Sequence, residues 1–590
     1  MSLDQNQIKA VEFDKGPALI IAGPGSGKTT VLTKRVAYLI EQRNVSPHRI
    51  LVITFTKSAA LQMKERFLKI TNGFYPVTFC TFHSLFYSII RESVNNRYSI
   101  ISPEEKLNII KESLLYNGID IDLVNIQALA DEFSKINNSH VNLHEFISLC
   151  LPKEDFIKVY VSYIKEKNSL MKIDYDDFAY LALDILKDRN TLNRWKNMYD
   201  YLLIDEFQDI NSIQYELIKT IFNENIYAVG DEDQSIYGFR GSSPEICFRF
   251  VDEFNAKKFY LTNNYRSFSE IVSIASMLIK NNKNRFDKDF NANKFDNKEH
   301  VFISKFNNYE NMYKEMAQKI KESLNNKEST VILARTNSIT PIFLKELDKC
   351  GIDIDRDNCK CTVNKEILKD ICTYMKMAFG ELNISNLLRI YNKPNRYISR
   401  AFINDLNIIA NEEFTFTNAL KAAKGKNYIV KALFVLEKNL SQIKAMDSYQ
   451  ALIFILKVIG YEDYLKKTKK QYDEDIKIIK EYAREFKDIK DFIENVELID
   501  GIEIKASKKR LMVEYTTMHS SKGLEWDNVF IADLQEGIIP HKRCSTIHEL
   551  EEERRLLYVA MTRARKRLWL GFVENEKAGI LPSIFIEEIS

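Results

Sequence analysis

Short apolar runs alternate with amphipathic stretches over the first 90 residues. The runs at 18–21, 51–55 and 77–81 have the length of buried strands, and segments with helical spacing separate them. This alternation predicts β–α–β units and therefore a mostly parallel sheet. Apolar runs at 201–204 and 226–229 continue the same pattern further along the chain. We expect these five segments to be strands of one sheet.

The alternation is lost between about residues 90 and 190. Helical patterns such as those at 103–116 and 177–186 predict an inserted helical subdomain there. Residues 380–504 are again helical and charged, with a long amphipathic run at 474–492. A second set of strand candidates lies at 259–261, 331–333, 513–516, 529–532 and 568–570. The pattern therefore predicts two α/β domains, each interrupted by a helical insertion.

Composition limits the class of protein without deciding it. A chain of 590 residues is too long for one core, so we expect about two to five domains. Hydrophobic residues make up 45% and charged residues 28%, as in globular proteins. The net charge of +2 is compatible with nucleic acid and does not require it. No apolar run could span a bilayer, so no membrane partner is expected.

Cysteine usage and the N-terminus both favour a cytoplasmic protein. The eight cysteines are scattered, and the first residues lack the basic and apolar regions of a signal peptide. Four cysteines lie closer together, but their spacing fits neither a zinc site nor an iron–sulfur run. We interpret them as buried thiols: Cys350, Cys359, Cys361 and Cys372.

A glycine-rich loop directly follows the first apolar run and leads into a helical pattern. Glycines let backbone N–H groups converge on phosphate oxygens, and the following helix favours the same anion. Lys28 can reach the β- and γ-phosphates, and the Thr29 hydroxyl can ligate Mg²⁺. The alternative is a glycine-rich turn between strand and helix. We predict a nucleoside triphosphate site on the residues Ala22, Gly23, Pro24, Gly25, Ser26, Gly27, Lys28 and Thr29.

Two acidic stretches follow predicted strands. Asp205 comes directly after one strand and can hold Mg²⁺, while Glu206 can orient and deprotonate an attacking water. Gln234 ends the second stretch, close to where a γ-phosphate would lie. The residues beyond it could stack on bases and contact a nucleic-acid backbone, or form a turn with an aromatic plug: Tyr237, Phe239 and Arg240.

These stretches resemble, in order, the motifs of UvrD/Rep/PcrA-type superfamily 1A DNA helicases. Residues 3–7 resemble the adenine-reading Gln motif of that family, and residues 54–57 and 81–84 resemble its early single-strand contact motifs. The resemblance runs from residue 3 to about residue 588. It is carried further by residues 173–178, 205–209, 230–237, 264–267, 519–526, 558–564 and 582–585.

The resemblance implies two RecA-like motors with ATP and Mg²⁺ bound between them. Gln7 would contact the adenine base and Tyr265 would stack on it, while Glu525 would bond the ribose. Arg266 and Arg563 would reach the γ-phosphate, where charge develops in phosphoryl transfer. The helix around Arg563 is expected to begin with acidic residues and to end with the basic residues 565–567. The first motor would supply Lys28, Thr29, Asp205, Glu206 and Gln234.

The same resemblance implies a partner, a direction and a division into domains. Single-stranded DNA and junctions with duplex are the expected partners, with 3′-to-5′ movement. The single-strand groove would be formed by Phe55, Thr81, His83, Tyr237, Phe239, Arg240 and His519. The first motor would comprise residues 1–88 and 189–263 with insertion 89–188, and the second 264–379 and 505–590 with insertion 380–504.

The chain departs from the family pattern at several places, and the lost glycines and the short second insertion favour an alternative function. Phe239 replaces a usual Trp, and Tyr397 and Ser399 replace two glycines of a duplex-contacting element. The second insertion is short, no C-terminal partner-binding tail is expected, and the basic run at 505–510 is interpreted as a linker. The alternative is a DNA-stimulated translocase, or a nucleotide-gated component of a repair or defence complex, with little unwinding alone. Cutting would then come from a nuclease or repair partner.

Overall fold

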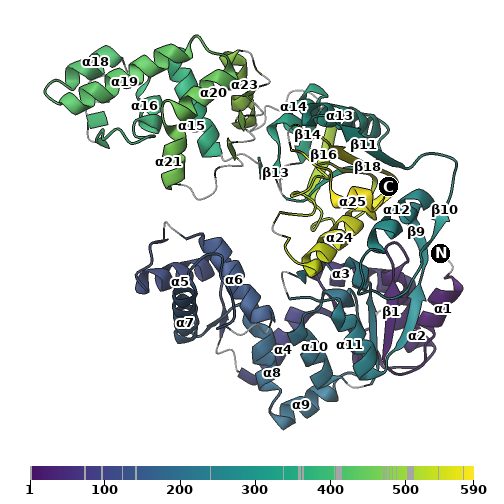
Figure 1. Cartoon of the computed structure of the whole chain (residues 1–590). Helices are drawn as coiled ribbons and strands as arrows, with labels where there is room; N and C mark the ends of the chain where they lie inside the picture. The colour runs from purple at the N-terminus through teal and green to yellow at the C-terminus, as the bar shows by residue number, and fades with distance from the viewer. Residues whose placement is uncertain are drawn as a thin grey trace. The chain divides into compact units, whose positions relative to one another are not determined.

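The computed structural model forms two compact units (Figure 1). The first comprises Met1–Ser304, Met518–Phe572 and Glu576–Ser590, and the second comprises Lys305–Thr517 and Val573–Asn575. The structure describes residues 3–71, 73, 75–94, 98–121, 124–139, 143–222, 224–238, 241–336, 338–355, 360–361, 365–400, 402–403, 406, 415–468, 472, 475–476, 479–480, 483–484, 486, 488–500, 511–542, 544–575, 577 and 579–589.

A parallel six-stranded sheet is the framework of the first unit. Its strand order is β3-β2-β6-β7-β1-β8, and all five pairings are parallel. The five strands predicted from the first apolar runs are confirmed. The run at 259–261 is β8 of this sheet, although the sequence pattern grouped it with the later strands. The strands are β1 (Ala18–Ala22), β2 (Ile50–Thr54), β3 (Thr78–Thr81), β6 (Tyr201–Ile204), β7 (Ile226–Gly230) and β8 (Lys257–Leu261).

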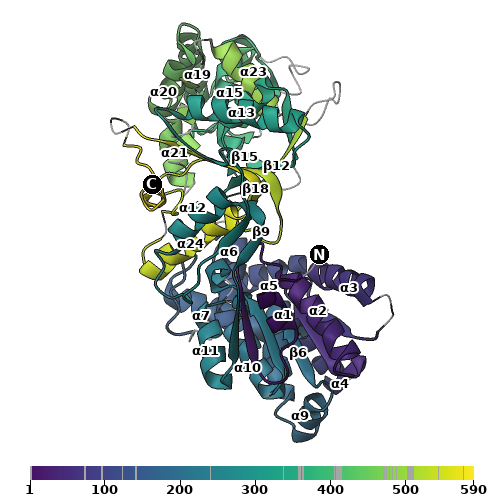
Figure 2. The same cartoon turned by 90° about the vertical axis from the view of Figure 1, so that its right-hand side faces the viewer.

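Successive residues of each strand face opposite sides of the sheet, so both faces are buried. Leu19 and Ile21 of β1 belong to the core on one side, whereas Ala18 and Ile20 belong to the core on the other. Figure 2 shows α2 on one side of these strands and α10 and α11 on the other. The helices around this sheet are α1 (Gln5–Val11), α2 (Lys28–Glu41), α3 (Lys57–Thr71), α4 (Phe82–Val94), α8 (Phe178–Ile185), α9 (Arg189–Lys196), α10 (Ser212–Ile221) and α11 (Glu245–Phe254).

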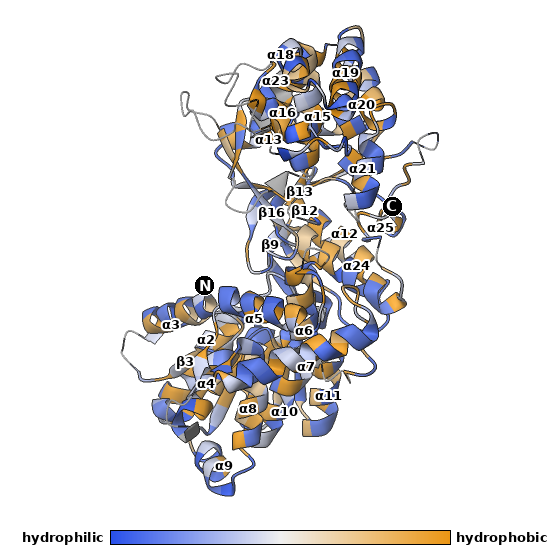
Figure 3. Cartoon of the chain, turned by 90° about the vertical axis from the view of Figure 1, so that its left-hand side faces the viewer, coloured by the Kyte–Doolittle hydropathy of each residue, from blue (hydrophilic) through white to orange (hydrophobic). Residues whose placement is uncertain are grey.

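The predicted first helical insertion has a core of its own. Phe133, Phe156 and Tyr163 are fully buried in it, and the helix predicted at 103–116 is confirmed as α5. Figure 3 shows that its helices combine hydrophobic and hydrophilic residues, as expected of helices that bury one face. The elements are α5 (Pro103–Tyr116), α6 (Ile126–Ser139), α7 (Lys153–Ser169) and the paired strands β4 (Ser99–Ile100) and β5 (Lys172–Ile173).

The remaining elements of the first unit follow β8 or come from the C-terminal part of the chain. The helix predicted to end at 565–567 ends instead at Met561, and those basic residues begin β18. The elements are β9 (Asn263–Phe268), α12 (Ser269–Ile279), β10 (Asn291–Lys294), β11 (Val301–Phe306), β17 (Trp526–Ile531), α24 (Ile547–Met561), β18 (Ala564–Val573) and α25 (Ile584–Glu587). The last residues of β11 and β18 are already assigned to the second unit. Strand β17 pairs in parallel with β18, so the strands predicted at 529–532 and 568–570 are confirmed.

The second unit joins three parallel strands to a set of helices. Strands β12 (Thr330–Ala334) and β14 (Ile352–Asp355) both pair in parallel with β16 (Leu511–Thr517), and short β13 (Ser338–Ile339) pairs with β15 (Lys360–Cys361). The helices are α13 (Tyr309–Asn325), α14 (Pro341–Lys349), α15 (Lys365–Ala378), α16 (Ile384–Ile390), α18 (Phe416–Ala422), α19 (Asn427–Ile443), α20 (Ser448–Lys457), α21 (Tyr461–Thr468) and α23 (Ile489–Asp500).

Three earlier expectations concern residues that lie wholly or partly outside the described chain. The run at 505–510 and half of the residues 474–487 lie outside the described residues, as does Cys359. Cys372 is buried in α15 as predicted, and Cys350 is partly buried. Within the described ranges, no helix combines the length and the apolar character that crossing a bilayer requires.

Candidate active site

The loop between β1 and α2 has the backbone of an anion cradle. Gly25 and Gly27 have φ angles of +70° and +85°, which favour glycine, and Gly27 immediately precedes α2. The Ser26 hydroxyl donates to the carbonyl oxygen of Gly23 at 2.8 Å. Lys28 opens the helix, so the positive end of the helix dipole lies at the loop. The local geometry fits a bound phosphate chain.

The ammonium group of Lys28 is buried at this loop. Its Nζ lies 3.8 Å from Glu206 Oε2, and within the described chain it makes no hydrogen bond. A buried cation without hydrogen bonds is costly in a resting protein. A phosphate oxygen would satisfy it.

Asp205 and Glu206 follow β6 at the carboxyl edge of the sheet, as predicted. Burial and then the charge of Glu206 raise the pKa of Asp205 to about 7. Burial also acts to raise the pKa of Glu206, but the charges of Lys28 and Lys522 outweigh it and lower that pKa to about 2. Glu206 has a φ of +50°, an uncommon conformation for a residue with a side chain. Glu206 is therefore charged at neutral pH and held in an unusual backbone conformation.

The alcohol of Thr29 and the carboxylate of Asp205 are oxygen donors of the kind that Mg²⁺ prefers. Thr29 follows Lys28 in α2, and Asp205 directly follows β6. This donor set fits the predicted metal.

Gln234 and Arg563 meet in the first unit although 329 residues separate them. Arg563 Nη2 lies 3.4 Å from Gln234 Oε1, and Gln234 Nε2 donates to Asp231 Oδ2 at 2.5 Å. Burial, together with repulsion from Arg266, lowers the pKa of Arg563 to about 9. The structure thus brings together two side chains that were predicted to act on the same phosphate.

Arg266 is held by Glu525, with Nε donating to Oε2 at 2.6 Å. Arg565 Nε also donates to Glu525, at 3.0 Å. The carboxylate predicted to bond a ribose therefore joins two arginines in this structure. The backbone N–H of Tyr265 donates to the Gly25 carbonyl at 3.0 Å, which ties Tyr265 and Arg266 to the phosphate loop.

The two residues predicted to contact adenine lie close to the same loop. Gln7 Nε2 donates to the Ser26 carbonyl at 2.9 Å, and Gln7 forms a capping box with Asp4 at the start of α1. The Tyr265 hydroxyl donates to Asp4 Oδ2 at 2.5 Å, and the residue is 37% exposed. Asp4 therefore connects Gln7 and Tyr265.

Lys522 is a site residue that the sequence analysis did not single out. Its Nζ donates to Asp209 Oδ2 at 2.5 Å and to the Gln234 carbonyl at 2.6 Å. It also lies 5.1 Å from the centre of the Tyr237 ring. Its place inside the motif at 519–526 was the available signal, but its partners are distant in sequence. Lys522 connects the predicted phosphate site to an aromatic side chain of the predicted DNA groove.

Several residues of the predicted DNA groove gather at the carboxyl ends of β2 and β3. The rings of Phe55 and Tyr237 stack at 5.3 Å, and Thr81 Oγ1 lies 3.0 Å from Ser84 Oγ. The ring of His83 lies 5.9 Å from that of Tyr175. His519 is partly exposed in the same unit, and Phe239 and Arg240 lie outside the described residues.

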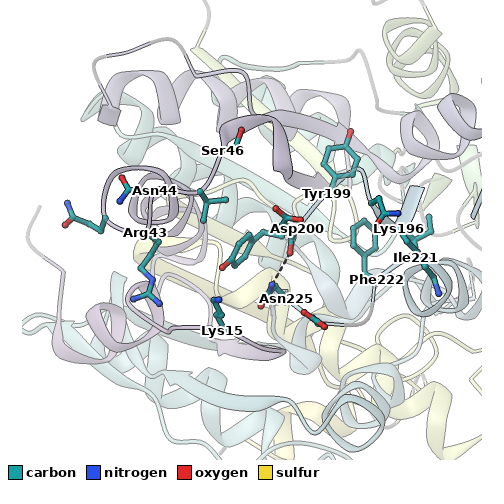
Figure 4. Close-up of a pocket in the computed structure, with 15 residues that line it drawn as sticks. Lys15, Arg43, Asn44, Ser46, Lys196, Tyr199, Asp200, Ile221, Phe222 and Asn225 are labelled. Atoms are coloured by element: carbon teal, nitrogen blue, oxygen red, sulfur yellow. Dashed lines mark hydrogen bonds between the residues drawn. The ribbon is translucent and has the colours of Figure 1, made fainter. Parts of the chain in front are cut away.

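A cavity of about 870 Å³ opens at the amino edge of the same sheet (Figure 4). Asp200 and Asn225, which line it, directly precede β6 and β7. Asn225 Nδ2 donates to the Asp200 carbonyl at 3.2 Å. The predicted site residues lie instead at the carboxyl edge, where open α/β sheets bind their ligands.

The loop that departs from the family pattern keeps a glycine-like backbone. Tyr397 has a φ of +56°, and its side chain is 77% exposed. Asn392 Oδ1 accepts hydrogen bonds from the backbone N–H groups of Arg396 and Ile398, at 3.1 and 3.2 Å. The loop conformation is thus compatible with a Tyr, and an exposed ring stands where the resemblance led us to expect a glycine.

Comparison with known proteins gives matches over nearly the whole chain. The model of the UvrD/REP helicase N-terminal domain matches residues 3–255, and that of the UvrD-like helicase C-terminal domain matches residues 259–575. The chain is 33% identical to a "Probable DNA helicase II homolog" of Mycoplasma capricolum, over 99% of this chain and 87% of the relative. It is 31% identical to "ATP-dependent DNA helicase Rep" of Buchnera aphidicola, over 100% and 96%. It is 28% identical to "ATP-dependent DNA helicase PcrA" of Staphylococcus epidermidis, over 100% and 86%.

Proposed function

Because this chain belongs to the UvrD/Rep family of ATP-dependent DNA helicases, we propose that it couples ATP hydrolysis to 3′-to-5′ movement on single-stranded DNA. The observation that carries the ATP site is the buried Lys28 ammonium, which makes no hydrogen bond within the described chain. It lies at a loop whose backbone suits phosphate.

The proposed chemistry assigns one task to each group. Glu206 accepts a proton from the attacking water, since its low pKa keeps it ionised. Lys28, Arg266 and Arg563 balance the charge that develops on the transferred phosphoryl group. Gln234 orients the attacking water and lies close to the γ-phosphate. Mg²⁺, held by Thr29 and Asp205, would neutralise phosphate charge. Adenine lies between Gln7 and Tyr265, and Glu525 bonds the ribose once Arg266 turns to the phosphate.

The proposed DNA path uses aromatic stacking, which tolerates any base sequence. Phe55 and Tyr237, which stack on each other in this structure, would separate to receive a base. The groove is completed by Thr81, His83, Phe239, Arg240 and His519. The direction of movement rests on the resemblance to the family.

The proposed domain division assigns two motors and two insertions. The first motor comprises residues 1–88 and 189–263, and the second comprises 264–379 and 505–590. Residues 89–188 and 380–504 are the insertions.

The alternative is a translocase, or a nucleotide-gated component of a repair or defence complex, that separates strands poorly alone. The exposed Tyr397 favours it, because a ring now stands where close approach of backbone to a duplex phosphate would need glycine. A nuclease or repair protein would then be the partner.

The deciding experiment measures ATP hydrolysis with and without single-stranded DNA, and unwinding of duplexes with only a 3′ or only a 5′ tail. Stimulation together with unwinding of the 3′-tailed duplex alone is expected. Stimulation without unwinding would support the alternative. Absence of stimulation would mean that the family resemblance is misleading about DNA as the substrate.

Phe239→Ala should weaken the response to DNA more than it weakens nucleotide binding. Loss of one stacking ring is worth about 1–3 kcal/mol, so the DNA concentration giving half-maximal ATPase should rise about tenfold. Phe295→Ala is the control, because Phe295 is 71% exposed and lies outside the proposed groove. DNA titrations of ATPase and equilibrium binding of a fluorescent ATP analogue provide the measurements. An unchanged half-maximal DNA concentration would remove Phe239 from the groove.

A further inference from the structure

We propose that Lys288 is a positioning residue for ATP hydrolysis, acting on Gln234 through the carboxylate of Asp231. This inference rests on the proposed function and adds a residue that no motif of the sequence analysis contained. Lys288 lies on the segment 285–290, between α12 and β10. Its side chain is 1% exposed.

The Lys288 ammonium sits among three consecutive carboxylates. Nζ lies 2.6 Å from Asp231 Oδ1, 2.7 Å from Glu232 Oε1 and 3.0 Å from Asp233 Oδ2. Among the described residues, these three acids are the one group of three or more His, Cys, Asp or Glu side chains whose ligand atoms lie close enough together to hold a metal ion. The ammonium already provides the positive charge at that point, so the group is a lysine cage and not a vacant metal site.

The cage continues directly to the predicted catalytic groups. One oxygen of Asp231 accepts from Lys288, and the other accepts from Gln234 Nε2. With its amide nitrogen held in this way, Gln234 presents Oε1 toward Arg563. Lys288 thus fixes the orientation of Asp231, and Asp231 fixes which amide atom of Gln234 faces the phosphate site.

The same segment also touches the phosphate loop. A Cβ built on Gly23 would fall 2.1 Å from the Phe290 ring, so the ring packs directly on the loop backbone. Arg285 Nη2 donates to Asp233 at 2.9 Å, and the Phe286 N–H donates to Glu232 at 2.8 Å. Residues 285–290 therefore hold the acidic turn and the phosphate loop in a fixed relation.

The test separates positioning from charge compensation. Lys288→Met alone leaves the three acids with Arg285 as their one remaining ion-pair partner among the described contacts, and it could fail to fold. The double variant Lys288→Met/Glu232→Gln removes one positive and one negative charge. With every group ionised, the wild-type cluster of three acids, Lys288 and Arg285 has a net charge of −1. The double variant keeps two acids and Arg285, so its net charge is also −1. The amide oxygen of the substituted glutamine can still accept the Phe286 N–H.

We expect the double variant to bind a fluorescent ATP analogue within threefold of the wild type and to lose at least tenfold in DNA-stimulated kcat. Lys280→Met is the matched control, since Lys280 is 55% exposed and pairs with Asp289; it should keep the wild-type kcat. Lys288→Arg should recover part of the lost rate, because it restores a cation beside Asp231. Binding, kcat and thermal melting would be measured on the same full-length preparations.

Each other outcome overturns the proposal. Wild-type kcat in the double variant would mean that Lys288 only balances charge. Loss of nucleotide binding or of the folded state would mean that it supports the fold. A wild-type protein without DNA-stimulated turnover would overturn the proposed function and the positioning role together. An active wild type with an equally active double variant would overturn the positioning role alone.

Discussion

Lys28→Ala is expected to lower kcat for ATP by at least about 10³-fold and to weaken ATP binding, with the fold retained. Lys28 is the cation closest to Glu206 at the phosphate loop, and its ammonium makes no hydrogen bond within the described chain. Removing it takes away a positive charge where phosphoryl transfer develops negative charge, an effect of the size seen when a preorganised donor is deleted. Steady-state hydrolysis with saturating single-stranded DNA, alongside thermal melting, measures it.

The matched control for this variant is Lys34→Ala, in the same helix and outside the proposed site. It should hydrolyse ATP at the wild-type rate. Melting temperatures of both variants should stay close to that of the wild type, because the Lys28 ammonium makes no hydrogen bond that the fold would lose. Substantial turnover by Lys28→Ala would show that residues 22–29 are a glycine-rich turn and not the nucleotide site.

Elements governed by local sequence were predictable. Strands β1, β6 and β7 are short apolar runs buried on both faces, so their positions follow from composition alone. The phosphate loop was also predictable, because its glycines must adopt conformations that other residues avoid. The residues that directly follow these strands then lie together at the carboxyl edge of the parallel sheet.

Long-range partners were not predictable from the chain. Lys288 is 57 residues from Asp231, and Lys522 is 313 residues from Asp209. The residues next to each lysine in the sequence are often charged, as they are in many solvent-exposed segments. What decides their burial is the packing of distant elements, which a single sequence does not specify.

The end of α24 shows that burial can outweigh the preference of basic residues for a helix C-terminus. Basic residues at 565–567 suit a helix C-terminus, so the helix was expected to reach them. In the structure Leu568 and Leu570 are buried in β18, and the strand begins at Ala564. Burial of two leucines is worth several times the interaction of exposed charges with a helix dipole.

Glu206→Gln should separate nucleotide binding from hydrolysis. Glutamine has nearly the same shape but cannot accept the proton of the attacking water, so kcat should fall by about 10³-fold. Lys28 and Lys522 hold the pKa of Glu206 at about 2, so at neutral pH the wild type carries a negative charge here that glutamine removes. With less repulsion of the triphosphate, the Kd for an ATP analogue should stay the same or decrease slightly.

Glu216→Gln is the control, because Glu216 is 44% exposed on α10 and pairs only with surface cations among the contacts described for it. Single-turnover hydrolysis and equilibrium binding of the analogue distinguish the two effects. Equal losses of binding and turnover in Glu206→Gln would assign the residue to holding nucleotide instead of activating water. A normal rate would show that another residue is the general base. Burial raises the pKa of Asp205 to about 7, so Asp205 would be the next carboxylate to test. Glu206, which is ionised at neutral pH, is assigned as the proton acceptor, and Asp205, which must lose its proton to bind Mg²⁺, is assigned as the metal ligand.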